Sequence, residues 1–216
     1  MLTLAVTSST AAVGVAVGTA GAEPGDVVHH HLETDRRHSE ELTPLVQAAL
    51  ADAGAAVGDL ELLAADIGPG RFTGLRVGLA TVRTLALAAE LPVVGLTSLE
   101  VLAAAEQERP LLAVIDARRA EVFQQRFDAD GPADDAVVGR PEDLAPAAVG
   151  CLVVGDGADR YAELYGEGVR PGRLPSAAVM VGLASAAAAR PGPEVVPSYL
   201  RDPDVNVNVK TRHTPR

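Results

Sequence analysis

The stretch Gly68-Pro69-Gly70-Arg71-Phe72-Thr73-Gly74 decides the fold of this 216-residue chain. A short apolar run over 60–67, typical of a buried strand, precedes it, and an apolar helical pattern over 75–90 follows. Glycines between a strand and a helix are typical of phosphate-binding loops, because they allow close backbone approach. The spacing, however, is neither that of a Walker A loop nor G-x-G-x-x-G. The alternative is a tight strand-to-helix turn with Thr73 as N-cap, which the spacing alone favours.

The pattern upstream and downstream of this loop predicts an α/β fold. Three β-prone runs open the chain, a helical period follows them, and strands and helices then alternate. This order is that of a ribonuclease H-like lobe. The predicted strands are 2–6, 13–17, 26–33, 60–67 and 92–95, and the predicted helices are 39–53, 75–90 and 97–105.

The second half of the chain shows a similar but shorter order of predicted strands and helices. A hairpin over 111–127, a strand at 151–154 and helices at 158–164 and 179–189 predict a second, degenerate lobe. Residues 128–146 show little pattern. We therefore expect two lobes, residues 1–105 and residues 106–216 with a tail, in a duplicated ribonuclease H-like architecture.

The predicted helix 75–90 is apolar on two sides. One side covers the sheet, and the other requires a second helix, a second lobe or another chain. A core helix enclosed within this chain is the alternative. The two faces consist of Leu75, Gly78, Leu79, Val82, Ala86 and Ala89, and of Val77, Ala80, Thr84, Leu87, Ala88 and Leu91.

Composition excludes several classes of function. The formal net charge is −11, and Lys210 is the one lysine, so an autonomous nucleic-acid binder is disfavoured. A single cysteine, Cys151, excludes an intramolecular disulfide and a cysteine-based metal cage. The first 22 residues lack the positive start of a signal peptide, and no run is long enough to span a membrane. We expect a cytoplasmic protein.

Few residues are candidates for chemistry. His29, His30 and His31 are consecutive in one predicted strand, so their side chains alternate between its two faces and only His29 and His31 share a face. This favours solvated edge-strand histidines over a zinc site. Asp116, at a predicted strand end, either coordinates magnesium or orients a nucleotide, or is an ordinary turn residue. Cys151 lies in an apolar strand and is expected to be inert. The sequence shows no nucleophile–base pair.

The block from Gly68 to Gly78 resembles the TsaB (YeaZ) family of tRNA threonylcarbamoyladenosine biosynthesis proteins, which belong to the glycoprotease-like family. Weaker matches to the family occur elsewhere along the chain, in the order in which the family has them. They are Leu4–Thr10, His38-Ser39-Glu40, Pro92–Glu100, Asp116-Ala117-Arg118 and Pro197–Arg201. Within the glycine block the family residues are Gly68, Gly70, Phe72, Thr73, Gly74 and Arg76.

The resemblance implies a two-lobed fold of the actin, sugar-kinase and heat-shock ATPase type. It also implies a non-catalytic subunit that pairs with its paralogue TsaD, is joined by the ATPase TsaE, and meets tRNA only through the complex. No cofactor is then expected on this chain alone, and ATP and metal are expected on the partner subunits. We expect the partner interface on Leu42, Leu45, Val46, Ala49, Val77, Leu79, Val82 and Leu87, with homodimers when the chain is isolated.

The chain departs from the catalytic pattern of this family at three positions. Ser98 and Leu102 stand where TsaD-like proteins carry a metal-binding His-x-x-x-His, and Thr7 stands where an aspartate is usual. Neither a hydroxyl nor an isobutyl group replaces an imidazole ligand. These departures predict a pseudo-enzyme.

Two rival functions stay open from the sequence. An active phosphotransferase of the same superfamily would bind magnesium nucleotide between the lobes and require Asp116. A glycoprotease-like hydrolase is the other, although its nucleophile or metal pair is missing. The basic end, Lys210 to Arg216, is either solvated or in contact with tRNA.

Overall fold

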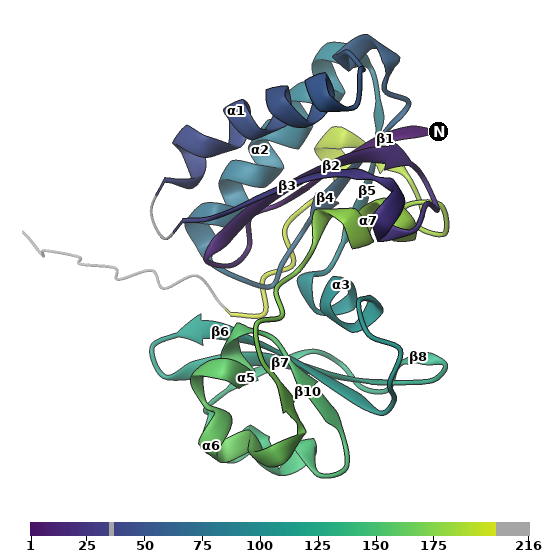
Figure 1. Ribbon diagram of the computed structural model, residues 1–216. Helices are drawn as coiled ribbons and strands as arrows, with labels where there is room; N and C mark the ends of the chain where they lie inside the picture. The colour runs from purple at the N-terminus through teal and green to yellow at the C-terminus, as the bar shows by residue number, and fades with distance from the viewer. Residues whose placement is uncertain (35–36, 202–216) are drawn as a thin grey trace, which may run out of the picture.

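The computed structural model describes residues 1–34 and 37–201 and contains two β-sheets, one in each lobe (Figure 1). The first sheet has the strand order β12-β5-β4-β1-β2-β3. Its strands are β1 (Leu2–Thr7), β2 (Ala12–Thr19), β3 (Val28–Glu33), β4 (Leu62–Asp66), β5 (Pro92–Leu96) and β12 (Arg190–Pro191).

The first lobe has ribonuclease H-like topology. Strands β1, β2 and β3 pair antiparallel, whereas β4 pairs parallel with β1, and β5 parallel with β4. Helices α1 (His38–Asp52) and α2 (Phe72–Ala89) connect these parallel strands and cover one face of the sheet (Figure 1). Helix α7 (Ala177–Leu183) packs on the opposite face. The predicted fold class is confirmed.

The second sheet repeats the strand order of the first. In the order β11-β10-β6-β7-β8, strands β6 and β7 are antiparallel and β10 and β11 run parallel to β6. Strand β9 also pairs with β7, so the stretch predicted to lack pattern supplies short strands and a helical turn. The elements are β6 (Leu111–Arg118), β7 (Glu121–Asp128), β8 (Gly131–Pro132), β9 (Val137–Gly139), α4 (Pro141–Leu144), β10 (Leu152–Val154), α5 (Asp156–Arg160), α6 (Ala162–Tyr165) and β11 (Val169–Arg170).

Helix α3 (Ser98–Ala104) lies between the two lobes (Figure 1). It begins with a capping box in which Thr97 Oγ1 accepts from the Glu100 amide and Glu100 accepts from the Thr97 amide. Leu99 and Leu102 pack into the core of the second lobe, and Val101 packs into that of the first. The helix therefore joins the two cores.

The predicted lobe boundaries need correction at the C-terminal side. After β11 the chain returns to the first lobe, where α7 packs on β1 and β2 and β12 pairs with β5. Residues 177–191 thus belong to the first lobe, although 106–216 was predicted as one second lobe. The sequence of a short Ala-rich helix does not indicate which sheet it packs on, so the sequence alone could not predict that the chain returns to the first lobe.

Candidate functional site

Asp66, the last residue of β4, is the centre of a buried hydrogen-bond cluster. Its Oδ2 accepts hydrogen bonds from the hydroxyls of Thr7, at 2.7 Å, and Ser9, at 2.5 Å. Its Oδ1 accepts from the hydroxyl of Ser98, at 2.5 Å, and from the Gly68 amide, at 2.9 Å. Only 3% of Asp66 is exposed, so these four donors stand in for water around the carboxylate.

The structure shows the contacts of Thr7, Ser98 and Leu102, two of which belong to the Asp66 cluster. A carboxylate has about four lone-pair sites, and here each is matched by a protein donor. Thr7 and Ser98 are two of those donors, and Leu102 is 1% exposed in the second-lobe core. This donor set does not fit a metal ion. Among residues 1–34 and 37–201, no group of three His, Cys, Asp or Glu side chains is placed to hold one.

The sequence alone did not point to Asp66. The signal that could have found it is an acidic residue at the end of an otherwise apolar strand, two positions before Gly68. A buried acid requires donors, and the hydroxyls at positions 7, 9 and 98 are too far away in sequence to be matched with it by spacing.

The glycine loop packs against the turn between β1 and β2. A Cβ on Gly74 would lie within 3.0 Å of the Ser8 carbonyl oxygen, and one on Gly70 equally close to that of Ser9. The Arg71 amide donates to the Ser9 carbonyl at 2.6 Å, and the Ser8 hydroxyl to the Gly74 carbonyl at 2.8 Å. The absence of a side chain at Gly70 and Gly74 therefore allows the protein's own backbone to approach the loop, whereas in a phosphate-binding loop it allows the ligand to approach.

The turn interpretation of the loop holds, but its predicted N-cap is wrong. Helix α2 already begins at Phe72, with Arg71 as N-cap and no side chain capping it, and Thr73 is an exposed residue inside the helix. The contacts of Gly74 with the β1–β2 turn fix the start of the helix, which a local capping rule does not include.

Helix α2 has one buried and one open apolar face. Leu75, Leu79 and Val82 are buried in the first-lobe core. On the open side Leu87 is 76% exposed, whereas Val77 and Leu85 are half-buried and pack against the first-lobe core. Within the described part of the chain, α2 alone is long and apolar enough to cross a membrane, but its buried face belongs to the first-lobe core.

This division corrects most of the predicted interface. Five of its residues are in the first-lobe core and cannot contact another chain, because helical periodicity does not distinguish which apolar face meets the sheet. Leu45 and Val77 are half-buried and Leu87 is exposed. The buried five are Leu42, Val46, Ala49, Leu79 and Val82.

A cavity of about 790 Å³ lies between the lobes. The glycine loop and the start of α2 line it from the first lobe, residues 116–119 line it from the β6–β7 turn, and residues 198–201 line it as well. Phe72 and Tyr199 lie with ring centroids 5.7 Å apart. The Arg76 guanidinium stacks on the Phe72 ring at 3.6 Å and donates to the Tyr199 hydroxyl at 3.2 Å.

Asp116 is fixed at the edge of this cavity. Its carboxylate pairs with Arg160 at 3.2 Å and with Arg118 at 3.7 Å, and it accepts from the Arg118 amide at 2.9 Å. Asp156 accepts from the Asp116 amide. Burial raises the pKa of the Asp156 carboxyl and outweighs this hydrogen bond, which lowers the pKa. Asp116 is thus a paired structural acid in a turn where Arg118, Arg119 and Ala120 have positive φ.

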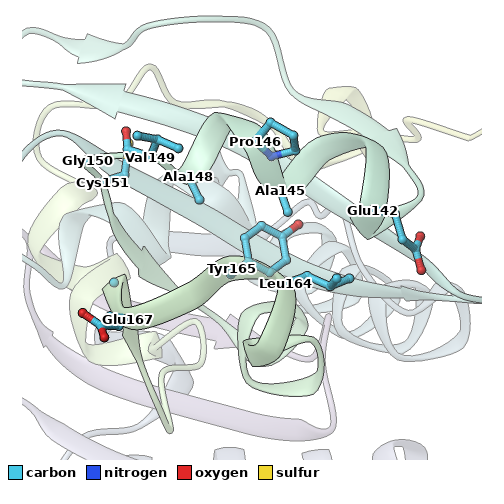
Figure 2. Close-up of a pocket in the computed structure, with 11 residues that line it drawn as sticks. Glu142, Ala145, Pro146, Ala148, Val149, Gly150, Cys151, Leu164, Tyr165 and Glu167 are labelled. Carbon is cyan, nitrogen blue, oxygen red and sulfur yellow. The ribbon is translucent and has the colours of Figure 1, made fainter.

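A second cavity, of about 540 Å³, lies on the second lobe (Figure 2). Figure 2 shows the Tyr165 ring near Ala145 and Leu164, with the carboxylates of Glu142 and Glu167 toward opposite ends. The Tyr165 hydroxyl donates to Gln124 Oε1 at 3.0 Å, and burial raises the pKa of this phenol. Burial also raises the pKa of the Cys151 thiol, which disfavours the reactive thiolate.

The three histidines lie on β3, an edge strand of the first sheet, as expected. His30 pairs with Asp52 of α1 at 2.9 Å, and the rings of His29 and His31 lie 6.3 Å apart on the other face. Burial lowers the pKa of His29, and the two neighbouring histidines lower it further. The predicted basic contact at 210–216 lies outside the described residues.

The chain is similar to known proteins over most of its length. The family model for TsaD, tRNA N6-adenosine threonylcarbamoyltransferase, matches residues 31–188. An uncharacterized protein of Mycobacterium tuberculosis is 38% identical over 175 residues, covering 78% of this chain and 77% of that protein.

Two further matches carry a family name. The tRNA threonylcarbamoyladenosine biosynthesis protein TsaB of Escherichia coli is 36% identical over 135 residues, covering 60% of this chain and 56% of that protein. The solved structure of YeaZ from Pseudomonas aeruginosa superposes with a TM-score of 0.78 at 27% identity, over 92% of this chain and 99% of that one.

Proposed function

Because this chain belongs to the TsaB (YeaZ) family of tRNA threonylcarbamoyladenosine biosynthesis proteins, we propose that it is a non-catalytic subunit that docks on the transferase TsaD. The pair, joined by the ATPase TsaE, transfers a threonylcarbamoyl group to the adenosine beside the tRNA anticodon. The chain meets tRNA through the complex, in the cytoplasm. ATP and metal for the reaction belong to the partner subunits.

The single observation that carries this proposal is the saturated Asp66 cluster. The Asp66 carboxylate accepts four internal hydrogen bonds, and Ser98, one of the two positions expected for a metal ligand, provides one of them. Replacing these hydroxyl donors with a metal would require reorganising a buried network, which is costly. Asp116, the remaining candidate acid, pairs with Arg118 and Arg160. Both facts favour docking over a phosphotransferase.

The open face of α2 supports the docking role. Leu87 is 76% exposed, and Ala80, Thr84 and Ala88 beside it on the helix are exposed and small. Small residues let another helix approach closely, and a large apolar side chain among them offers area to bury. In the absence of TsaD the same face favours homodimers.

Reconstitution tests the proposal directly. TsaD, TsaE, tRNA, ATP and the threonylcarbamoyl donor are incubated with and without this chain, and modified adenosine is measured after digestion of the tRNA. We expect product to depend on both TsaD and this chain, and none to form with this chain in place of TsaD. Equal product with and without the chain would contradict the proposal, and so would turnover by the chain alone.

A further inference from the structure

Two exposed histidines of β3 have imidazole nitrogens that the fold does not use. Of the other histidines that the structure describes, His30 pairs with Asp52, and the buried His38 hydrogen-bonds to a backbone carbonyl. His29 and His31 are exposed, and within residues 1–34 and 37–201 neither ring forms a hydrogen bond or an ion pair. Their nitrogens are therefore available to a ligand from solution.

The strand places these two rings beside each other. Alternate residues of a strand point to the same face, so His29 and His31 project from one face of β3 and His30 from the other. The ring centroids of the pair lie 6.3 Å apart, with the ring planes inclined by 32°. Two imidazoles that each bind one ion through a nitrogen at about 2.1 Å have centroids roughly 5–6.5 Å apart. Small rotations of the two exposed side chains would bring both rings onto one ion.

The surroundings of the pair are open to solvent. Strand β3 lies at the end of the first sheet, so its outer edge faces away from the other strands. The neighbours of His29 and His31 on β2 are Ala16 and Gly14. A methyl group and a hydrogen atom cannot cover the imidazole rings, so a hydrated ion can reach them from outside.

Charge and ligand type favour a transition-metal cation at this place. Glu33 follows on the same exposed face of β3, and the chain has a net charge of −11, so the local field attracts cations. Imidazole nitrogen binds Zn²⁺, Ni²⁺ and Cu²⁺, whereas Mg²⁺ prefers oxygen ligands. Glu33 contributes charge and is not one of the ligands, because no group of three such side chains in the described residues is placed around one ion.

We propose that His29 and His31 together bind one divalent transition-metal ion, with water in the remaining coordination positions. A zinc site that supports a fold has four protein ligands, so a site with two is a surface site from which the ion exchanges. The site lies on the outer edge of the first lobe and is separate from the buried Asp66 cluster. Its occupancy does not depend on pairing with TsaD.

Isothermal titration of the isolated full chain with NiCl₂ and with ZnCl₂ tests this inference. The titration is run at about pH 7.5, where an unperturbed imidazole is neutral and its nitrogen lone pair is free. We expect saturable binding of one ion per chain, and no binding of MgCl₂ at the same concentrations. Absence of saturable binding of both transition metals overturns the proposal, and so does one ion shared by two chains.

The histidine triplet supplies its own matched control. His29→Gln/His31→Gln should weaken Ni²⁺ binding at least tenfold, whereas His30→Gln removes an imidazole from the opposite face and should change affinity less than twofold. Each single variant, His29→Gln or His31→Gln, should cause most of the loss, because both rings are needed to hold the ion. Unchanged binding by the double variant, or an equal loss in His30→Gln, would contradict the site. Both side chains are exposed, so thermal unfolding in EDTA should be the same for all variants.

Discussion

Ser98 donates its hydroxyl hydrogen to Oδ1 of Asp66 across 2.5 Å, and so joins the start of α3 to the end of β4. Both side chains are buried. The acceptor is the carboxylate that also accepts hydrogen bonds from Thr7 and Ser9. Asp66 is therefore an internal support of the first lobe.

Replacing Asp66 should therefore destabilise the fold. Asp66→Ala leaves three buried hydroxyls and the Gly68 amide without their acceptor, and each hydrogen bond to a charged group contributes about 1.5–3 kcal/mol. We expect the free energy of unfolding in urea to fall by roughly 3 kcal/mol or more. Asp52→Ala, which removes an exposed ion pair with His30, should cost about 1 kcal/mol or less. Similar losses for the two would contradict a structural role of Asp66.

The glycine loop gives a second stability prediction. In Gly74→Ala the new methyl group would collide with the Ser8 carbonyl, which is backbone and cannot rotate away. We expect a loss of roughly 3 kcal/mol in the free energy of unfolding. Gly58→Ala is the matched control, because a Cβ there has no neighbour within 4 Å, and it should stay within about 0.5 kcal/mol of wild type. A tolerated Gly74→Ala would mean that the loop does not pack on the β1–β2 turn.

Asp156 gives a prediction for pH. Burial raises its pKa above the ordinary 3.8, so the folded state binds the proton more tightly than the unfolded state does. Stability from this group is therefore greatest at low pH and falls as pH rises from 3.8 toward the raised value. Asp156→Asn keeps an acceptor for the Asp116 amide and loses the charge.

We accordingly expect Asp156→Asn to be more thermally stable than wild type at pH 7. The difference should disappear below pH 3.8, where the wild-type carboxyl is neutral in both states. The exposed Asp130→Asn should give no such pH-dependent difference. A destabilised Asp156→Asn at pH 7 would contradict the dominance of burial over the hydrogen bond from the Asp116 amide.

The fold followed from sequence because its determinants are local. Short β-prone and apolar runs predicted β1 to β5, the spacing of Thr97 and Glu100 predicted the α3 capping box, and glycines marked the loop before α2. These signals fixed the ribonuclease H-like order of both lobes. The return of α7 to the first lobe was not predictable, because an Ala-rich helix fits either sheet.

The candidate sites could not be predicted from the sequence, because motif spacing does not show contacts between distant segments. Asp66 accepts hydrogen bonds from three separate segments, and the lining of the interlobe cavity also comes from three. Periodicity found both apolar faces of α2 but could not assign the core to one of them. Burial of Val82 and exposure of Leu87 decide that point.

Binding of this chain to purified TsaD, measured by titration of wild type and Leu87→Arg, tests the central claim most directly. Leu87 is 76% exposed, so the variant should fold normally while placing a charge in the open face of α2. The matched control is Val149→Arg on the second lobe, where Val149 is 85% exposed. We predict a tight wild-type complex, at least tenfold weaker binding by Leu87→Arg, and unchanged binding by Val149→Arg. No binding by wild type, or equal binding by all three, would contradict docking through α2.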